Sequence, residues 1–166
     1  MAYAIGTVTG DGTALAHQKM LTVFRSLCES VGWVVLRHNT SAENHELIMR
    51  APGLSGTEEI FVGVRTYQSV TGDYYNLLLG VFTGYVPENT FDGQPGARLC
   101  GVPAHNNSID YFATANGQRL VFMLKVSTPV YMHGYAGKIM PYARPSEFPY
   151  PVACAGILDG PVGTRF

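Results

Sequence analysis

The hydrophobic pattern of the chain changes its period after Gly32. Before that point apolar residues recur every three or four positions, and after it they alternate with polar ones. In the clearest case, TEEIFVGVRTYQ, two sets of residues alternate: Ile60, Val62, Val64 and Thr66 on one side, and Phe61, Gly63, Arg65 and Tyr67 on the other. A period of two residues is typical of a β-strand with two different faces. The sequence therefore predicts one helix followed by a sheet.

The helical segment is expected to run from Thr13 to about Val31. Its apolar residues fall at helical spacing and form one face: Met20, Leu21, Phe24, Leu27, Cys28 and Val31. Thr13 is a plausible N-cap, and Gly32 is placed to end the helix. No other segment shows a convincing helical pattern.

Several other segments read as strands. Residues 1–12 are expected to form a short strand or arm, and WVVLRH, ENHELIMRAP and PVYMHGYAGKIM are further strands. The segment from Asp73 to Tyr85 is apolar on both faces, which is typical of an internal strand or of one that another subunit covers. Asn116-Gly117 between two β-rich runs predicts a hairpin with a type I′ turn. Residues 87–108 are expected to be a long, contact-making loop.

This order of elements predicts an α+β fold in which β-structure dominates. One N-terminal helix packs on a mainly antiparallel sheet of about six strands, followed by an extended Pro/aromatic C-terminal segment. We expect a single domain. Residues 1–137 form its helix-plus-sheet part, and residues 138–166 form an arm that packs on the domain or on a neighbour.

Composition points to burial against partners. Only 14% of the residues are charged and 46% are hydrophobic, so much of the surface must be uncharged. Such surfaces are common on subunits that bury faces against neighbours. The net charge is −1, with Lys and Arg scattered, which argues against nucleic acid as a partner. No apolar run is long enough for a membrane helix, and the N-terminus does not resemble a signal peptide.

The sequence offers little for catalysis. Cys100 and His105 are close together, but no third orienting group can be placed beside them. His38 and His45 flank polar residues, although a metal-dependent nuclease would also need a basic surface. Common nucleophile, metalloprotease and nucleotide-binding motifs are absent. We predict that the protein is not an enzyme and has no cofactor or metal. Its three cysteines are expected to be reduced and mostly buried.

The segment from Lys138 to Gly156 combines prolines with aromatic residues. Proline fixes φ and favours extended backbone before it, so the segment loses little entropy when it docks. Aromatic side chains there and on the strand that begins at Asp73 suit an interface with few charges. The predicted assembly interface consists of Tyr74, Tyr75, Tyr142, Phe148, Pro149, Tyr150 and Pro151.

Three segments resemble a family of tailed-bacteriophage virion proteins. In that family a strand of the type "YVGIxTYxSxxxDYYN" is followed by an Asn-Gly hairpin and by a block such as "YLGxFLPYATPSQYPYPLxxGG". Residues 59–76, 115–126 and 135–156 carry the resemblance. Arg144 and Glu147 depart from it, because they put charge into a block that is usually neutral. The resemblance implies a structural subunit of the tail or baseplate, present in several copies, and no catalytic residues.

Two alternatives stay open beside the tail or baseplate subunit. One is a neck or tail-completion protein, which would also be a virion component. The other is a receptor- or carbohydrate-binding module that uses exposed tyrosines. In the leading interpretation the partners are copies of the chain and other virion proteins, and the protein is assembled in the host cytoplasm into the virion tail.

Overall fold

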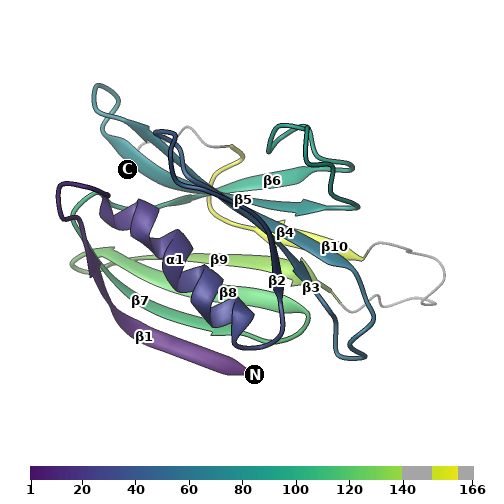
Figure 1. The fold of residues 1–166 in the computed structure, drawn as a ribbon. Helices are drawn as coiled ribbons and strands as arrows, with labels where there is room; N and C mark the ends of the chain where they lie inside the picture. Colours follow the sequence, from purple (N-terminus) through teal and green to yellow (C-terminus); the bar gives the residue numbers. More distant parts are fainter. Residues whose placement is uncertain (140–150, 161–166) are drawn as a thin grey trace.

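The computed structural model describes residues 1–139 and 151–160 and confirms a β-dominant α+β fold with one N-terminal helix (Figure 1). The described elements are β1 (Ala2–Thr9), α1 (Ala16–Glu29), β2 (Val34–Asn39), β3 (Glu46–Ala51), β4 (Ile60–Ser69), β5 (Tyr74–Phe82), β6 (Arg98–Pro103), β7 (Ser108–Ala115), β8 (Arg119–Ser127), β9 (Val130–Lys138) and β10 (Val152–Ala155). Residues 140–150, which contain most of the Pro/aromatic segment, and residues 161–166 lie outside the described residues.

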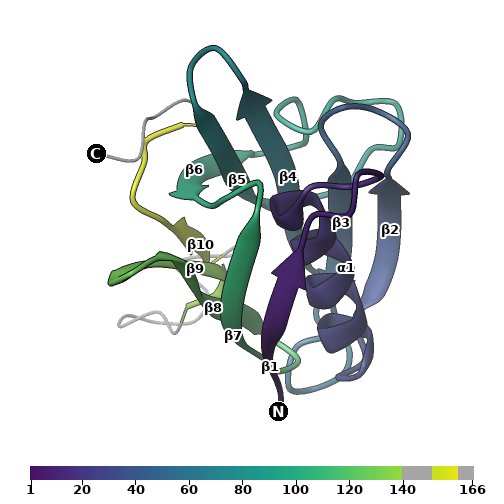
Figure 2. The ribbon, with the colours of Figure 1, turned by 90° about the vertical axis from the view of Figure 1, so that its left-hand side faces the viewer.

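The strands form two antiparallel sheets rather than the expected single sheet of about six strands. Sheet A has the order β1-β7-β8-β9-β10 and sheet B has the order β2-β3-β4-β5-β6, five strands each. Figures 1 and 2 show the two sheets as layers, with α1 between them on one side. Alternation along a strand predicts two faces, but it does not identify the neighbouring strand. The division into two sheets was therefore invisible in the sequence.

The main hydrophobic core lies between the two sheets and under α1. Phe24 of α1 packs on Phe122 of β8, with 4.7 Å between their ring centroids. The indole N–H of Trp33 donates to the carbonyl of Asn116 at 2.7 Å and so joins the end of α1 to the β7–β8 turn. The helix thus lies on the side of the sandwich between β1 and β2 (Figure 2). Its predicted apolar face is buried there in the main core.

The helix begins two residues later than expected from a Thr13 cap. Leu15 is its N-cap, and the side-chain oxygen of Gln18 accepts the Leu15 N–H at 2.8 Å. Thr13 instead belongs to a turn in which the Asp11 carboxylate accepts its N–H at 3.0 Å and its hydroxyl at 2.6 Å. The prediction for Gly32 is confirmed, since it follows the helix with a positive φ of 88°.

The predicted β7–β8 hairpin is confirmed, but the prediction of a type I′ turn is wrong. Neither Asn116 nor Gly117 has a positive φ, which a type I′ turn centred on them would require. The Asn116 side chain instead accepts the Gln118 N–H at 2.8 Å. The Gly117 carbonyl accepts the Gly53 N–H at 2.7 Å, so contacts from sheet B also hold the turn.

The expected loop 87–108 contains a strand, β6, which pairs with β5. Near the C-terminus, β10 pairs with β9 and the chain then crosses to sheet B, where Leu158 and Gly101 exchange backbone hydrogen bonds of 2.7 and 2.9 Å. The described residues 151–160 therefore link the two sheets. None of the helices in the described part of the chain has the length and apolar character needed to span a membrane.

Candidate assembly surface

The outer face of sheet A, on the side away from α1, carries large apolar side chains that are exposed. On β1, Tyr3 is 77% exposed and Ile5 is 63% exposed. On the next three strands, Phe112 is 42%, Met123 is 39% and Tyr131 is 49% exposed. We call these five residues the open face. Single exposed apolar residues are ordinary, but a contiguous group of them marks a contact surface.

Strand register joins much of the open face into one patch. Ile5 lies directly opposite Phe112, and Phe112 lies opposite Met123, so the three form a row across three strands. The neighbouring row toward the β1 C-terminus is polar, because Asp110 lies opposite Lys125 and pairs with it at 3.5 Å. Directly opposed side chains in a sheet are close enough to touch. The row is therefore a continuous apolar strip with charge at its border.

Strand β1 forms a free edge of sheet A beside the open face (Figure 2). Just beyond β1, the Gly10 N–H donates to the Asn107 carbonyl at 3.3 Å. In an antiparallel pair, every second residue of a strand bonds to the partner strand. Gly10 bonds to the residue just before β7, so the even-numbered residues of β1 bond to β7 too, and the backbone groups of Tyr3, Ile5 and Thr7 point away from β7. Within residues 1–139 and 151–160, no backbone group pairs with them on that side. These backbone groups therefore have no described backbone partner, on the side of β1 where α1 lies next to it (Figure 2).

The other sheet edges each carry a feature that blocks pairing. Strand β2 has an irregular register between Val35 and Arg37, which is typical of a β-bulge. The free side of β6 is occupied where Gly101 pairs with Leu158, and β10 is only four residues long. Strand β1 has eight residues in unbroken register, without charge or proline. Long, regular, uncharged edges are the ones that pair with other chains.

The outer face of sheet B, in contrast, is covered by the chain itself. A second hydrophobic cluster lies there, formed by Ile48, Leu78, Phe82 and Phe91. Phe91 comes from the segment 83–97 and is completely buried, in edge-to-face contact with Phe82 at 5.5 Å. Gly63 lies opposite Gly80 in the sheet beneath, and a Cβ at position 63 would lie 2.6 Å from the Phe91 ring. Gly63 thus leaves room for the Phe91 ring, and Gly80 leaves room for Phe82, on which Phe91 packs.

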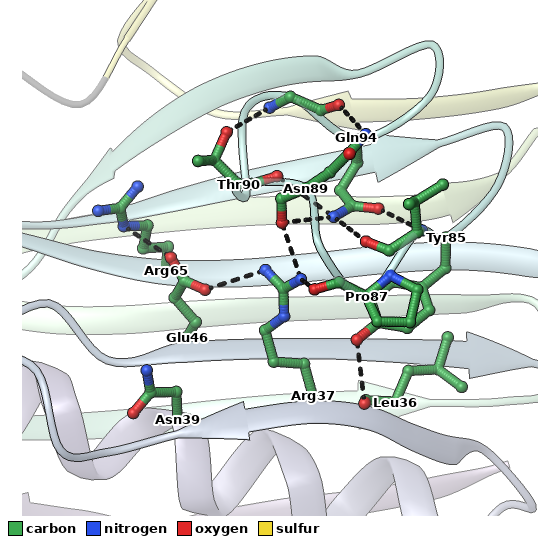
Figure 3. A network of polar contacts seen from close by, with 12 residues as sticks. Leu36, Arg37, Asn39, Glu46, Arg65, Tyr85, Pro87, Asn89, Thr90 and Gln94 are labelled. Atoms are coloured by element: carbon green, nitrogen blue, oxygen red, sulfur yellow. Dashed lines mark hydrogen bonds and ion pairs between the residues drawn. The ribbon is translucent and has the colours of Figure 1, made fainter.

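Polar contacts hold the covering segment 83–97 in place (Figure 3). Gln94 is 3% exposed, and its amide nitrogen donates to the carbonyls of Val86, Asn89 and Thr90 at 3.0, 3.1 and 3.2 Å. Its amide oxygen accepts the Val86 N–H at 2.9 Å. One side chain therefore satisfies four backbone groups of a segment that has no regular structure.

Arg37 joins this segment to the strands of sheet B (Figure 3). Its guanidinium donates to the carbonyls of Pro87 and Asn89 at 2.7 and 2.8 Å. It also pairs with Glu46 at 3.3 Å, and Glu46 pairs with Arg65 at 3.3 Å. Because both guanidinium groups lie against the Glu46 carboxylate, this network joins the cover to the sheet without leaving one of its three half-buried charges isolated.

The structure places only some of the residues predicted for the assembly interface. Tyr75 is 7% exposed and lies edge-to-face with His17 at 5.6 Å, so its ring is inside the molecule. Tyr74 is half-buried beside the β4–β5 turn. Pro151 is half-buried, and its carbonyl accepts the Ile139 N–H at 2.8 Å. The other four predicted residues lie outside the described residues: Tyr142, Phe148, Pro149 and Tyr150. Their role in an interface stays a prediction.

Sequence reasoning missed four residues of the open face, namely Tyr3, Ile5, Phe112 and Met123. A signal for them was present. In AYAIGTVT both sets of alternating residues include apolar side chains, and the same holds for IDYFATA. A strand that is apolar on both faces requires cover on both faces. This argument was applied only to the strand that begins at Asp73.

The histidines occupy different environments in the described part of the chain. His17 is completely buried, and neither ring nitrogen makes a hydrogen bond to another described residue. Burial, with a smaller effect of charge on His45, lowers the pKa of His17 to about 4, and the nearby Gln68 amide offsets this only in part. Burial, followed by the charge of Arg25, also lowers the pKa of His38. Among residues 1–139 and 151–160, no group of three or more His, Cys, Asp or Glu side chains is placed to hold a metal ion.

Cys100 and His105 have different partners. The Cys100 thiol lies near Cys154, and its interaction with that thiol, followed by burial, raises the pKa of Cys100. The Nδ1 atom of His105 accepts the Asn107 N–H at 3.0 Å. The arrangement therefore resembles turn structure at His105 rather than a thiol–imidazole pair.

Comparison with known proteins adds no family assignment: neither a protein-family model nor a curated protein sequence matches the chain. The resemblance to tailed-phage virion proteins stays a sequence-based prediction.

Proposed function

We propose that the protein is a structural subunit of a tailed-bacteriophage virion, in the tail or baseplate, and that it acts by assembling with copies of itself and with other virion proteins. The observation that carries the assembly role is the open face next to the unprotected edge of β1. The assignment to a phage tail or baseplate rests on the resemblance carried by residues 59–76, 115–126 and 135–156.

The contact we propose is antiparallel pairing of β1 with β1 of a neighbouring copy. With Ile5 opposite Ile5 of the neighbour, Tyr3 of each copy would lie opposite Thr7 of the other. The outward backbone groups of these three residues would then pair across the contact. The apolar row from Ile5 to Met123 would continue from one copy into the next, which joins the two open faces into one surface.

The size of the open face suits such a role. From the exposed fractions, its five side chains present about 500 Å² of surface, since a large apolar side chain contributes about 200 Å². Stable interfaces bury about 800 Å² on each partner, so the strand edge and the open face together reach that scale. Further virion proteins are expected to cover the part of the open face that β1 pairing leaves exposed.

The first experiment measures the mass of the purified protein in solution by size-exclusion chromatography with light scattering, over a wide range of concentrations. We expect an oligomer for the native chain. Ile5→Lys should weaken self-association about 100-fold, because it puts a charge at the centre of the contact. Val70→Lys is the matched control, since Val70 is 82% exposed and lies between β4 and β5, away from the edge.

A native chain that stays monomeric at all concentrations would exclude β1 pairing as the contact between copies. Equal association of the Ile5→Lys and Val70→Lys proteins would exclude it as well. The location in the particle is tested by cryo-electron microscopy of virions from the source phage. Density for this fold in the tail or baseplate would support the proposal, whereas density at the neck, or absence from the particle, would contradict it.

A further inference from the structure

Two cysteines that are far apart in the sequence meet between the two sheets. Cys100 lies on β6 of sheet B and Cys154 lies on β10 of sheet A. Both pack against the main core. Cys154 lies opposite the fully buried Ala136, so its side chain points inward toward sheet B. The cysteines thus approach each other from opposite layers.

Contacts of the sulfur atoms confirm this placement. The Sγ atom of Cys154 lies 3.3 Å from the carbonyl oxygen of Arg98, two residues before Cys100 on the same strand. The interaction between the two thiols also shifts the pKa of both, which is in keeping with neighbouring side chains. Both residues are half-buried rather than enclosed, so small reagents can reach them. A disulfide bond requires the sulfur atoms to approach to roughly 2 Å, which side-chain rotation can bring about for two cysteines that face each other.

We propose that Cys100 and Cys154 are an oxidation site, which closes into a disulfide between sheets A and B when the protein meets a low-molecular-weight disulfide such as oxidised glutathione. This inference does not depend on the proposed function. The sequence predicts cysteines that are reduced and mostly buried, but only Cys28 is buried, whereas Cys100 and Cys154 are half-buried and form the proposed reactive pair.

The opposite pKa shifts of the two neighbouring thiols indicate which one reacts first. The interaction between them lowers the pKa of Cys154 and raises that of Cys100, so the first proton lost by the pair leaves a thiolate at Cys154. Burial raises the pKa of Cys28 and disfavours its thiolate. Cys154 is therefore the expected nucleophile, and Cys28 is expected to be unreactive.

The reaction is a two-step thiol–disulfide exchange. The Cys154 thiolate attacks one sulfur of oxidised glutathione, which forms a mixed disulfide and releases one glutathione thiolate. That thiolate takes up the Cys100 proton, directly or through water. The Cys100 thiolate then attacks the Cys154 sulfur and releases a second glutathione. In total, two protein thiols are oxidised and one glutathione disulfide is reduced to two thiols.

The disulfide would fasten a weakly held element. Strand β10 is four residues long and pairs only with β9 within sheet A. A bond from Cys154 to β6 would attach it to sheet B as well. It would also close a loop of more than 50 residues between the two cysteines, which restricts the unfolded chain. We expect the melting temperature to rise by about 10 °C on oxidation.

The test uses the full-length chain, first fully reduced and then equilibrated with mixtures of reduced and oxidised glutathione. Intact mass spectrometry should show a loss of about 2 Da without a glutathione adduct. Peptide mapping should link Cys100 to Cys154, and calorimetry should show the rise in melting temperature. Cys28→Ala is the matched control and should oxidise as the native chain does. Cys100→Ser should instead retain glutathione on Cys154, a gain of about 305 Da.

Three results would overturn the inference: no loss of mass at the most oxidising ratio, stable glutathione adducts on the native chain, or an oxidised protein that melts at or below the temperature of the reduced one. The mass and mapping measurements on the native chain do not require any variant to fold. They also leave the oligomeric state unexamined, so their outcome is separate from that of the assembly proposal.

Discussion

The outer faces of the two sheets both carry large apolar side chains, but these are buried on sheet B and exposed on sheet A. On sheet B, residues such as Leu78 and Phe82 are almost fully buried, because segment 83–97 packs over them. On sheet A, Phe112 is 42% exposed and Ile5 is 63% exposed, and no described segment lies over them. The difference shows that an apolar outer face does not by itself distinguish a second internal core from a contact surface. The deciding factor is whether another segment of the same chain packs over that face.

The cover belongs to sheet B for a local reason. Gly63 and Gly80 face each other there; the absence of a side chain at Gly63 leaves room for the Phe91 ring, and its absence at Gly80 leaves room for Phe82. The corresponding central row of sheet A is filled by Ile5, Phe112 and Met123, which leave no such room. A flat apolar strip of this kind suits another flat surface, such as a neighbouring subunit.

The largest effect is expected from truncating one phenylalanine on each face. Phe91→Ala should lower the free energy of unfolding by about 4 kcal/mol, because it empties a fully buried site. Phe112→Ala should cost about 1 kcal/mol or less in the isolated subunit, because its ring is already 42% exposed. Urea unfolding of the two variants measures the comparison directly. Equal losses in the free energy of unfolding would show that Phe112 is as well packed in the isolated subunit as Phe91.

A second prediction compares a histidine between the sheets with one on the outer face of sheet A. Because the pKa of His17 is lowered from 6.5 to about 4, the unfolded chain binds the proton more readily, and stability falls as the pH drops through this window. The loss should be about 3 kcal/mol between pH 7 and pH 4.

His17→Phe should remove this part of the pH dependence, because phenylalanine keeps a ring against Tyr75 and cannot be protonated. His133→Phe is the matched control, since His133 is exposed opposite Met123. Urea unfolding at several pH values measures both. The same pH dependence in the His17→Phe protein as in the native chain would show that this imidazole does not account for the loss.

The smallest effect is expected within the cover itself. Gln94→Ala should cost about 2 kcal/mol, because four backbone groups lose a buried partner. Hydrogen exchange should be faster at the Val86 amide, which Gln94 accepts in the native protein. Glu88→Ala, an exposed change in the same segment, should leave both quantities unaltered. Unchanged exchange at Val86 in the Gln94→Ala protein would show that another contact holds the segment.

Much of the local structure could be predicted from short-range patterns. The apolar face of α1, the Gly32 stop and the two-faced strand β4 follow from residue spacing and from backbone freedom. The predicted type I′ turn at Asn116-Gly117 failed because partners in sheet B hold this turn in another conformation. Strand β6 was missed because its flanking glycines and prolines suggested a loop.

The candidate site was predicted less well than the fold. Two of the described interface residues, Tyr75 and Pro151, make contacts within the chain. The residues of the open face lie on strands that were expected, but their exposure depends on which segment covers them. Such exposure depends on how the whole molecule packs. Alternation along a strand therefore identifies apolar side chains on its outer face, but it does not show whether another segment covers them.

By itself, the sequence determined that this chain would combine one amphipathic helix with antiparallel strands and expose few charges, because periodicity and composition act through neighbouring residues. Only the tertiary structure decided that the strands divide into two sheets and that Phe91 covers sheet B. It also decided that sheet A keeps an open face and that Cys100 meets Cys154. The physical reason is that these features require contacts between segments far apart in the chain, and local patterns do not specify which distant partner makes them.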